Sequence, residues 1–399
     1  MTDRGVVGGV TSEGACGAGL FDEVRAAVPI TRSRAYLFAG GMAPLCSTAR
    51  EALEAWAALC SSDPVVAYSE YPREEAARLR ELVAGLIGAQ AEDVALLDST
   101  SRGNNLAVAM IDAPEGTNVV VDVTTYPSAL YPWLLPAKGH VQLRRVSGED
   151  GLPVIEDFER LVDDRTVAIS VSHVCRLTGF KHDLGSLASL AHAHGAYLLV
   201  DGAQSVGATR IDVQADSVDF LSFGAMKWLL GTPGIGFMFV RPELQAELVP
   251  PHVGPEGARL LQRGDEEKLD FFPGAARHAL STMHWGGLGA SRRGVDLLAN
   301  VPPAQVERRI LDLSGYLIDG LRSRGIAVRT PVERARRAGV VAFTFGHPDS
   351  LRLHLRTRGV DVWGYENQRI VRADPHVYNT HEDVDRLLTG IDDWRRHHA

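Results

Sequence analysis

Cysteine is scarce in this chain of 399 residues, and long apolar runs are missing from it. The four cysteines, Cys16, Cys46, Cys60 and Cys175, lack C-x-x-C spacing, so they indicate neither a metal site nor a disulfide framework. No segment approaches the roughly 18 consecutive apolar residues of a membrane-spanning helix. The first 20 residues are rich in Gly, Ser and Thr and predict a loose arm rather than a signal peptide. We therefore expect a cytoplasmic protein with no metal and no membrane partner.

A large excess of charge of one sign is also absent. The formal net charge is -9, and it is spread along the chain without a basic block or the aromatic and basic interleaving of a nucleic-acid groove. A small-molecule substrate is therefore a better expectation than a nucleic acid. Hydrophobic residues make up 45% of the chain, enough for a large core, and the length favours two domains over one.

From about residue 75 the sequence alternates between helical and strand patterns. Leu79, Leu82, Val83 and Leu86 recur at helical spacing, and a series of short apolar runs predicts buried strands. These runs are 94–97, 119–121, 167–171, 197–200, 218–223 and 235–240. Such alternation is typical of an α/β fold with a mostly parallel sheet covered by helices.

The pattern changes after about residue 290. A long helical stretch leads into strand candidates at 326–329 and 340–345, and an amphipathic helix over 382–394 follows. This part predicts a smaller α+β domain, into which the N-terminal segment could also pack. The predicted division is an N-terminal arm over 1–33, a large domain over 34–290 and a small domain over 291–399.

An acidic residue and a lysine stand out at the ends of two predicted strands. Asp201 ends the run that begins at Tyr197, where ligands of open α/β sheets bind, and Lys227 follows 26 positions later. Pyridoxal 5'-phosphate (PLP) chemistry needs this pair, because a lysine forms the Schiff base and a carboxylate keeps the ring nitrogen protonated. Gln204 could hydrogen-bond the phenolic oxygen of the cofactor. Taken singly, Asp201 could be a helix cap and Lys227 a solvated side chain.

The two segments together resemble the class V aminotransferase family, which includes cysteine desulfurases, isopenicillin N epimerase-like proteins and kynureninases. The matching motifs are Asp-Gly-Ala-Gln at 201–204 and Lys-Trp-Leu-x-Gly-x-Pro-Gly-Ile-Gly at 227–236. The resemblance runs from about residue 34 onward. It implies the PLP-dependent fold of aspartate aminotransferase, PLP as cofactor, and a homodimer whose active sites are completed by the partner subunit.

The resemblance also implies roles for other residues. Thr100 and Ser101 fall in a segment similar to the family's phosphate-binding turn at a helix N-terminus. Tyr126, where many members have His, falls in the segment whose aromatic ring stacks on the pyridine. Thr282 falls where the family sends a threonine to the other subunit's phosphate. Arg372 matches the arginine that grips the substrate's α-carboxylate.

Three departures from the family pattern affect the predicted chemistry. Many members place Ser and His just before the lysine, whereas this chain has Gly224, Ala225 and Met226, so the phosphate contacts there must differ. Cysteine desulfurases carry a persulfide-forming cysteine before the C-terminal arginine motif, but no cysteine follows Cys175 here. Arg176 occupies a position where the family commonly has Asn. A fixed cation there favours a substrate with a second anionic group or a polar conjugate, although Arg176 and Arg372 could instead be surface ion-pair partners.

The predicted function is therefore that of a PLP-dependent enzyme acting on an amino acid. Our first choice is a lyase that breaks the C–S bond of cysteine or an S-conjugated cysteine by β-elimination and releases pyruvate and ammonia. It depends on the family resemblance and on the missing persulfide cysteine. Aminotransferase, epimerase and decarboxylating chemistry remain alternatives within the fold, as does a PLP-binding protein without turnover.

Overall fold

A seven-stranded sheet forms the centre of the computed structural model, which describes residues 13–263 and 266–398. The strand order is β2-β8-β7-β6-β5-β3-β4. The strands are β2 (Val94–Leu97), β3 (Asn118–Asp122), β4 (Gln142–Val146), β5 (Thr166–Ser172), β6 (Tyr197–Asp201), β7 (Phe220–Gly224) and β8 (Gly236–Val240). The pairs from β7 through β6, β5 and β3 to β4 are parallel, while β8 runs antiparallel to both β7 and β2. The mostly parallel sheet predicted from the apolar runs is confirmed.

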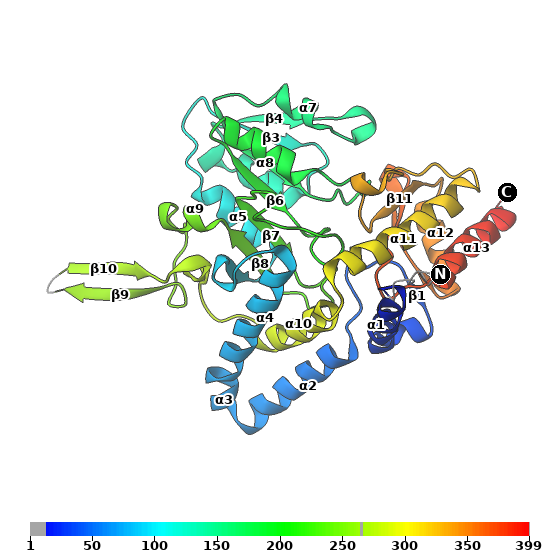
Figure 1. The fold of residues 1–399 in the computed structure, drawn as a ribbon, viewed down its shortest axis with the longest axis horizontal. Coiled ribbons are helices and arrows are strands. Elements are labelled where there is room, and N and C mark those ends of the chain that lie inside the picture. The colour runs from blue at the N-terminus through cyan, green and yellow to red at the C-terminus, as the bar shows by residue number, and fades with distance from the viewer. Residues whose placement is uncertain (1–12, 264–265, 399) are drawn as a thin grey trace, which may run out of the picture.

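Helices cover both faces of this sheet (Figure 1). They include α5 (Thr100–Met110), α6 (Pro127–Leu130), α7 (Ile155–Glu159), α8 (Leu184–Ala193) and α9 (Pro242–Glu247). Another group lies to one side, where α10 (Trp285–Ala299) packs against α2 (Ser47–Ser62) and α4 (Tyr71–Ile87), with α3 (Pro64–Ser69) between the last two in sequence. Apart from the edge strand β4, the strands are buried along almost their whole length because helices pack on both faces, as expected for apolar runs without alternation.

A second apolar cluster lies around a three-stranded sheet with the order β11-β14-β13. Its strands are β11 (Val341–Thr344), β13 (Trp363–Tyr365) and β14 (Ile370–Ala373), and its helices are α11 (Pro303–Arg322), α12 (Pro348–Thr357) and α13 (His381–His398). The N-terminal strand β1 (Ala35–Tyr36) pairs in parallel with β12 (Val360–Asp361), so the N-terminal segment does pack into this part. The predicted domain boundaries at 33 and 290 stay predictions.

Two local predictions were wrong. Residues 326–329 form no strand, since only Val328 makes a β-bridge, to Phe343. The loose arm expected over the first 20 residues is already helical from Glu13, where α1 (Glu13–Ala27) begins, and residues 1–12 lie outside the described part. This helix is held by its C-terminal half, because Val24 is buried and Arg25 forms an ion pair with Asp383 at 2.8 Å.

The sequence patterns did not reveal the hairpin of β9 (Ala258–Arg263) and β10 (Glu266–Phe271). It extends away from the rest of the molecule (Figure 1), and its apolar side chains Leu260 and Leu269 are exposed. Charged residues fill much of β10, so the run lacks the apolar signal that marks a buried strand. Within the part of the chain that the structure describes, no helix combines the length and apolarity needed to cross a bilayer.

Gly236 allows the turn after β2 to lie against β8. A Cβ atom at this position would lie 2.6 Å from the backbone carbon of Ser99, so no side chain fits there without movement. We expect Gly236→Ala to lower the free energy of unfolding by about 1–3 kcal/mol through overpacking. Urea denaturation measures this change.

Gly85 provides the matched control. It lies near the end of α4, and nothing lies within 4 Å of a Cβ placed on it. Gly85→Ala should stabilise the protein slightly, by about 0.5 kcal/mol, because alanine has the higher helix propensity. Equal effects of the two substitutions would contradict this account of Gly236.

Candidate active site

The candidate site lies at the carboxyl edge of β5, β6 and β7. Asp201 is the last residue of β6, and its register partners are Ser172 at the end of β5 and Ser222 in β7. Lys227 follows β7 after two residues, the first of which, Ala225, donates its N–H to the Ile235 carbonyl at 3.0 Å. Carboxyl ends of parallel strands meet at one edge of a sheet, so the fold brings Asp201 and Lys227 to the same crevice.

Asp201 is a buried carboxylate, 3% exposed, that is oriented by neutral donors. Oδ2 accepts from Asn104 Nδ2 at 3.0 Å and from Ser128 Oγ at 3.4 Å, while Oδ1 accepts from the Ala203 amide at 3.0 Å. No ion pair in residues 13–263 and 266–398 involves it. Burial raises the pKa of Asp201 above its ordinary value, and these hydrogen bonds and the charge of Lys227 oppose the shift. A cation held against Asp201 would therefore be strongly favoured.

Lys227 faces the same crevice, and its amine is free of hydrogen bonds to the described residues. Its Nζ lies 5.8 Å from the centre of the Tyr126 ring, and it makes no hydrogen bond within the described residues. Burial lowers the pKa of Lys227 below the usual lysine value, while Asp201 opposes this shift. The environment thus favours the neutral, nucleophilic amine more than water does.

Tyr126 lies between two cations. Its amide donates to Ser172 Oγ at 2.9 Å, and the residue is 42% exposed. The guanidinium carbon of Arg176 lies 5.5 Å from the ring centre of Tyr126 and 5.7 Å from that of Tyr365. The ring is therefore available on the side of the crevice where Lys227 reaches it.

Arg372 and Arg176 differ in their electrostatic partners. Arg372 is 2% exposed, and its Nε donates to Asp374 Oδ1 at 2.7 Å, while its Nη1 donates to the Arg176 carbonyl at 3.2 Å. Arg176 is half-buried and forms no ion pair within the described residues. The charge of Arg372 is thus balanced by a buried carboxylate, and that of Arg176 is not. The prediction that these residues contact the substrate stays a prediction.

Gln204 connects the crevice to the N-terminal and C-terminal segments. Its Oε1 accepts from Trp228 Nε1 at 3.0 Å and from Arg372 Nη2 at 3.1 Å, and its Nε2 donates to the Gly40 carbonyl at 2.8 Å. One Nε2 hydrogen remains for a bond to a cofactor oxygen. Its predicted role as a cofactor ligand stays a prediction.

The predicted phosphate ligands lie at the N-terminus of α5. Ser99 caps the helix through its Oγ, which accepts from the Arg102 amide at 3.2 Å. Thr100 is half-buried, and its Oγ1 would lie 3.2 Å from a Cβ placed on Gly224, so the turn closely approaches the lysine segment. Ser101 follows it and is exposed. The free amides of a helix N-terminus suit an anion, and the roles of both residues stay predictions.

Thr282 lies apart from this cluster within the single chain. It is exposed in the segment that precedes α10, and no described contact joins it to Lys227. Its predicted contact across a dimer stays a prediction.

Several residues that position the site were not singled out from the sequence. Asn104 and Ser128 orient Asp201, and Asp374 balances Arg372. His376 stacks on Trp228 with ring centres 5.5 Å apart, and its Nε2 bonds the Trp228 carbonyl at 3.1 Å. Asn104 and His376 stood inside motifs that the resemblance identified, but only their contacts show which groups they orient.

The crevice has the groups that PLP requires. A buried carboxylate without a cationic partner could face the ring nitrogen, an unbonded amine could hold the cofactor covalently, and a helix N-terminus could take the phosphate. The residues present therefore fit this cofactor.

Comparisons with known proteins agree on one family. The profile described as Aminotransferase class-V matches residues 36–387. A cysteine desulfurase of Escherichia coli (strain SE11) is 30% identical over 322 residues, which cover 75% of this chain and 77% of the relative. An apo cysteine desulfurase from Thermococcus onnurineus NA1 has a TM-score of 0.82 at 24% identity, covering 94% of this chain and 97% of that chain. A cystine C-S lyase in complex with its product cysteine persulfide has a TM-score of 0.81 at 20% identity, covering 91% and 98%.

His376 makes the stability of this region depend on pH. Its Nδ1 accepts from the Val377 amide at 2.9 Å, so the ring is neutral with the proton on Nε2. Burial lowers the pKa of His376 from 6.5 to about 4. The folded state thus binds fewer protons than the unfolded state, and its stabilisation is complete above pH 6.5 and is lost as the pH falls toward 4. We expect urea midpoints to decrease over this range.

His376→Gln isolates this contribution, because glutamine keeps a donor but does not titrate. The variant should be less stable at pH 7.5 and should lose less stability on acidification, by roughly 2–3 kcal/mol between pH 6.5 and 4. His252→Gln, at an exposed histidine, should retain the wild-type profile. A parallel decline in His376→Gln and the wild type would contradict the prediction.

Proposed function

This chain belongs to the Aminotransferase class-V family, and from that premise we propose that it is a PLP-dependent lyase for cysteine or an S-conjugated cysteine. The reaction is β-elimination across the C–S bond followed by hydrolysis, which consumes one water molecule and releases a sulfur product, pyruvate and ammonia. The observation that carries the proposal is the unbonded Lys227 amine beside the buried Asp201 carboxylate and the Tyr126 ring. The names of the relatives, cysteine desulfurase and cystine C-S lyase, support C–S chemistry.

Each site residue has a proposed place around the cofactor. Lys227 would hold PLP covalently, Asp201 would face its ring nitrogen, and Tyr126 would pack on its ring. Thr100 and Ser101 would bind the phosphate, and Gln204 the phenolic oxygen. Bound in this way, PLP supplies an electron-accepting ring that weakens the bonds at the substrate's α-carbon.

Lys227 then acts as the base. Burial lowers the pKa of Lys227, which would keep Nζ ready to take the α-proton of the substrate. The C–S bond breaks with its electron pair leaving on sulfur. Asp201, held by Asn104 and Ser128, keeps a negative charge in place through this step.

The position of the cysteines supports direct elimination over a persulfide route. No cysteine follows Cys175 in the sequence. Cys46 and Cys175 are buried, and Cys60 is exposed on α2. None of these three lies in the segment between β12 and Arg372, where the family resemblance places the persulfide cysteine, so the sulfur product is released directly.

The two arginines have different proposed roles, because Arg372 is paired with a carboxylate and Arg176 is not. Arg372 faces the α-carboxylate, as the resemblance implies, with its orientation fixed by Asp374 and Gln204. Arg176 carries an unbalanced charge between Tyr126 and Tyr365, so we propose that it binds a second anionic group of the substrate.

A homodimer in the cytoplasm is also proposed. Thr282 and apolar side chains such as Tyr68, Tyr131 and Leu134 are exposed in the single chain, which suits a surface covered by a partner subunit. The free thiols of Cys46, Cys60 and Cys175 suit a reducing compartment.

Lys227→Ala tests the proposed function. The purified wild type, loaded with PLP, should show a visible absorbance band and should release pyruvate from a panel of S-conjugated cysteines. Lys227→Ala should lose the band and lower kcat by at least about 1000-fold, because both the covalent link and the base are gone. Lys268→Ala, at an exposed lysine of β10, is the matched control and should retain both.

The products separate the alternatives. A keto acid with a pyridoxamine form would indicate transamination, and a D-amino acid would indicate epimerisation. Either result in place of pyruvate would contradict β-elimination. Binding of amino acids without any turnover would contradict the enzymatic proposal.

The Arg176→Ala variant tests whether Arg176 binds a second anionic group of the substrate. S-carboxymethyl-L-cysteine and its amide, S-carbamoylmethyl-L-cysteine, differ only in that charge. We expect KM for the acid to rise about 10- to 100-fold, the effect of losing a charged hydrogen bond, with little change for the amide. Arg176→Lys should restore part of the affinity, and Arg50→Ala, at an exposed arginine of α2, should change neither substrate. An equal rise in KM for the acid and the amide would contradict the proposed role of Arg176.

A further inference from the structure

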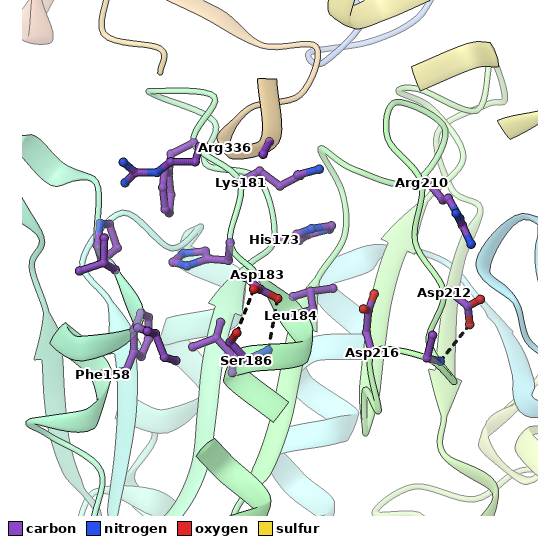
Figure 2. Close-up of a pocket in the computed structure, with 18 of the residues that line it drawn as sticks. Phe158, His173, Lys181, Asp183, Leu184, Ser186, Arg210, Asp212, Asp216 and Arg336 are labelled. Carbon is purple, nitrogen blue, oxygen red and sulfur yellow. Dashed lines mark hydrogen bonds between the residues drawn. The ribbon is translucent and has the colours of Figure 1, made fainter. Parts of the chain in front are cut away.

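A cavity of about 610 Å³ lies apart from the residues around Lys227. It is formed by the segment around α7, the residues leading into α8, the connection before β7 and two contributions from the C-terminal part, Glu307 on α11 and Arg336. Its volume is that of a small-molecule site. Figure 2 shows Phe158 at one side of the lining, and Asp212 with Asp216 at the other.

One wall of the cavity is apolar and aromatic. Phe158, Phe180, Leu184 and Leu187 contribute to it. The Phe158 and Phe180 rings both stand edge-on to His182, with ring centres 5.6 and 4.9 Å apart. This wall offers a fixed surface for the body of an aromatic or aliphatic ligand.

Three carboxylates of the lining have no basic partner. Asp183 lies beside Leu184 at the start of α8, and Asp212 and Asp216 lie across from Phe158 (Figure 2). Asp183, Asp212 and Asp216 form no ion pair within the described residues. A methyl group placed on Gly185 would lie 3.7 Å from Oδ1 of both Asp183 and Asp216, so two of the carboxylates face the same turn of α8. Burial raises the pKa of Asp216, and the charges of Asp212 and Asp183 add to this shift. A cation at this side of the lining would relieve that repulsion.

The basic side chains of the lining balance these carboxylates only in part, although the charge of Lys181 opposes the raised pKa of Asp216. Lys181 Nζ lies 3.7 Å from Glu307 Oε1, and the guanidinium of Arg336 lies over the Phe180 ring at 5.2 Å. Arg210 is exposed. This side of the lining therefore keeps a net negative character.

His173 adds an unsatisfied polar group to the cavity. Its side chain is 4% exposed, it lines the cavity, and neither ring nitrogen has a hydrogen-bond partner among the described residues. Nδ1 is fully enclosed, so Nε2 is the nitrogen that a ligand in the cavity could reach. Burial lowers the pKa of His173 to about 3, so the ring is neutral and offers one donor and one acceptor. Buried polar groups are rarely left without a partner, and this one points to a ligand.

We propose that this cavity binds a small organic cation. The cationic group faces Asp183, Asp212 and Asp216, the apolar body packs on Phe158 and Phe180, and a polar substituent bonds His173. The site is separate from PLP chemistry, and the proposal does not depend on the proposed function.

The cavity shares a chain segment with the candidate active site. The loop over 173–182 folds back on itself, because the Cys175 amide donates to the Phe180 carbonyl at 2.8 Å and the His182 amide to the His173 carbonyl at 3.0 Å. Arg176 lies in the turn of this loop, while His173, Phe180 and His182 line the cavity. A ligand in the cavity thus contacts the same loop that presents Arg176.

Binding of phenethyltrimethylammonium to the PLP-loaded protein tests the proposal by calorimetry. This quaternary ion cannot react with the cofactor's carbonyl carbon. We expect a Kd of roughly 0.1–1 mM, typical of a small fragment, with 2-phenylethanol weaker and 3-phenylpropanoate not binding. Equal binding of the cation and the carboxylate would overturn the proposal.

Four variants locate the binding site. Asp216→Asn should weaken binding of the cation about fivefold, and Val154→Lys, at an exposed rim position, should weaken it without disturbing the core. Glu115→Gln, at an exposed carboxylate outside the cavity, should have no effect. Tyr126→Ala should also leave binding of the cation unchanged. If Tyr126→Ala abolished binding while Asp216→Asn and Val154→Lys did not, the cation would lie in the active site, and the proposal would be overturned.

Discussion

The buried carboxylate of Asp201 is the constraint on which the site depends. Removing a carboxylate from water costs several kcal/mol unless other groups compensate for the lost hydration. Here three neutral donors, from Asn104, Ser128 and the Ala203 amide, do so in part. They come from α5, from α6 and from the chain just after β6, so these elements must all be in place for the charge to be tolerated. A cationic group of a ligand, such as the protonated ring nitrogen of PLP, would supply the remaining stabilisation.

A second set of contacts connects the lysine segment to the C-terminal part of the chain. Trp228, the residue after Lys227, stacks on His376 and donates to Gln204. Gln204 in turn accepts from Arg372 and donates to Gly40. Residues from four distant parts of the sequence thus form one hydrogen-bonded network beside the candidate site. Because its members are buried, loss of any one leaves a polar group without a partner.

The arrangement of charges distinguishes the two arginines of the candidate site. Asp374 neutralises Arg372, which fixes the guanidinium but reduces its attraction for anions. Arg176 is held between two tyrosine rings, which orient it without cancelling its charge. The difference in charge balance is the basis of the substrate-binding role proposed for Arg176.

The sequence by itself determined the sheet, the family and the pair Asp201 and Lys227, because apolar runs and a lysine motif depend on local chemistry. It did not determine the β9–β10 hairpin, whose charged strand has no burial signal, or the helix that begins at Glu13. Nor could it show that Asn104 orients Asp201 or that Asp374 balances Arg372, since a polar side chain has no partner until the chain folds. Only the tertiary structure brought His173, Phe158 and Asp216 around one cavity. Periodicity reports which face of an element is buried, whereas the partner of each buried charge is decided by distances between residues far apart in sequence.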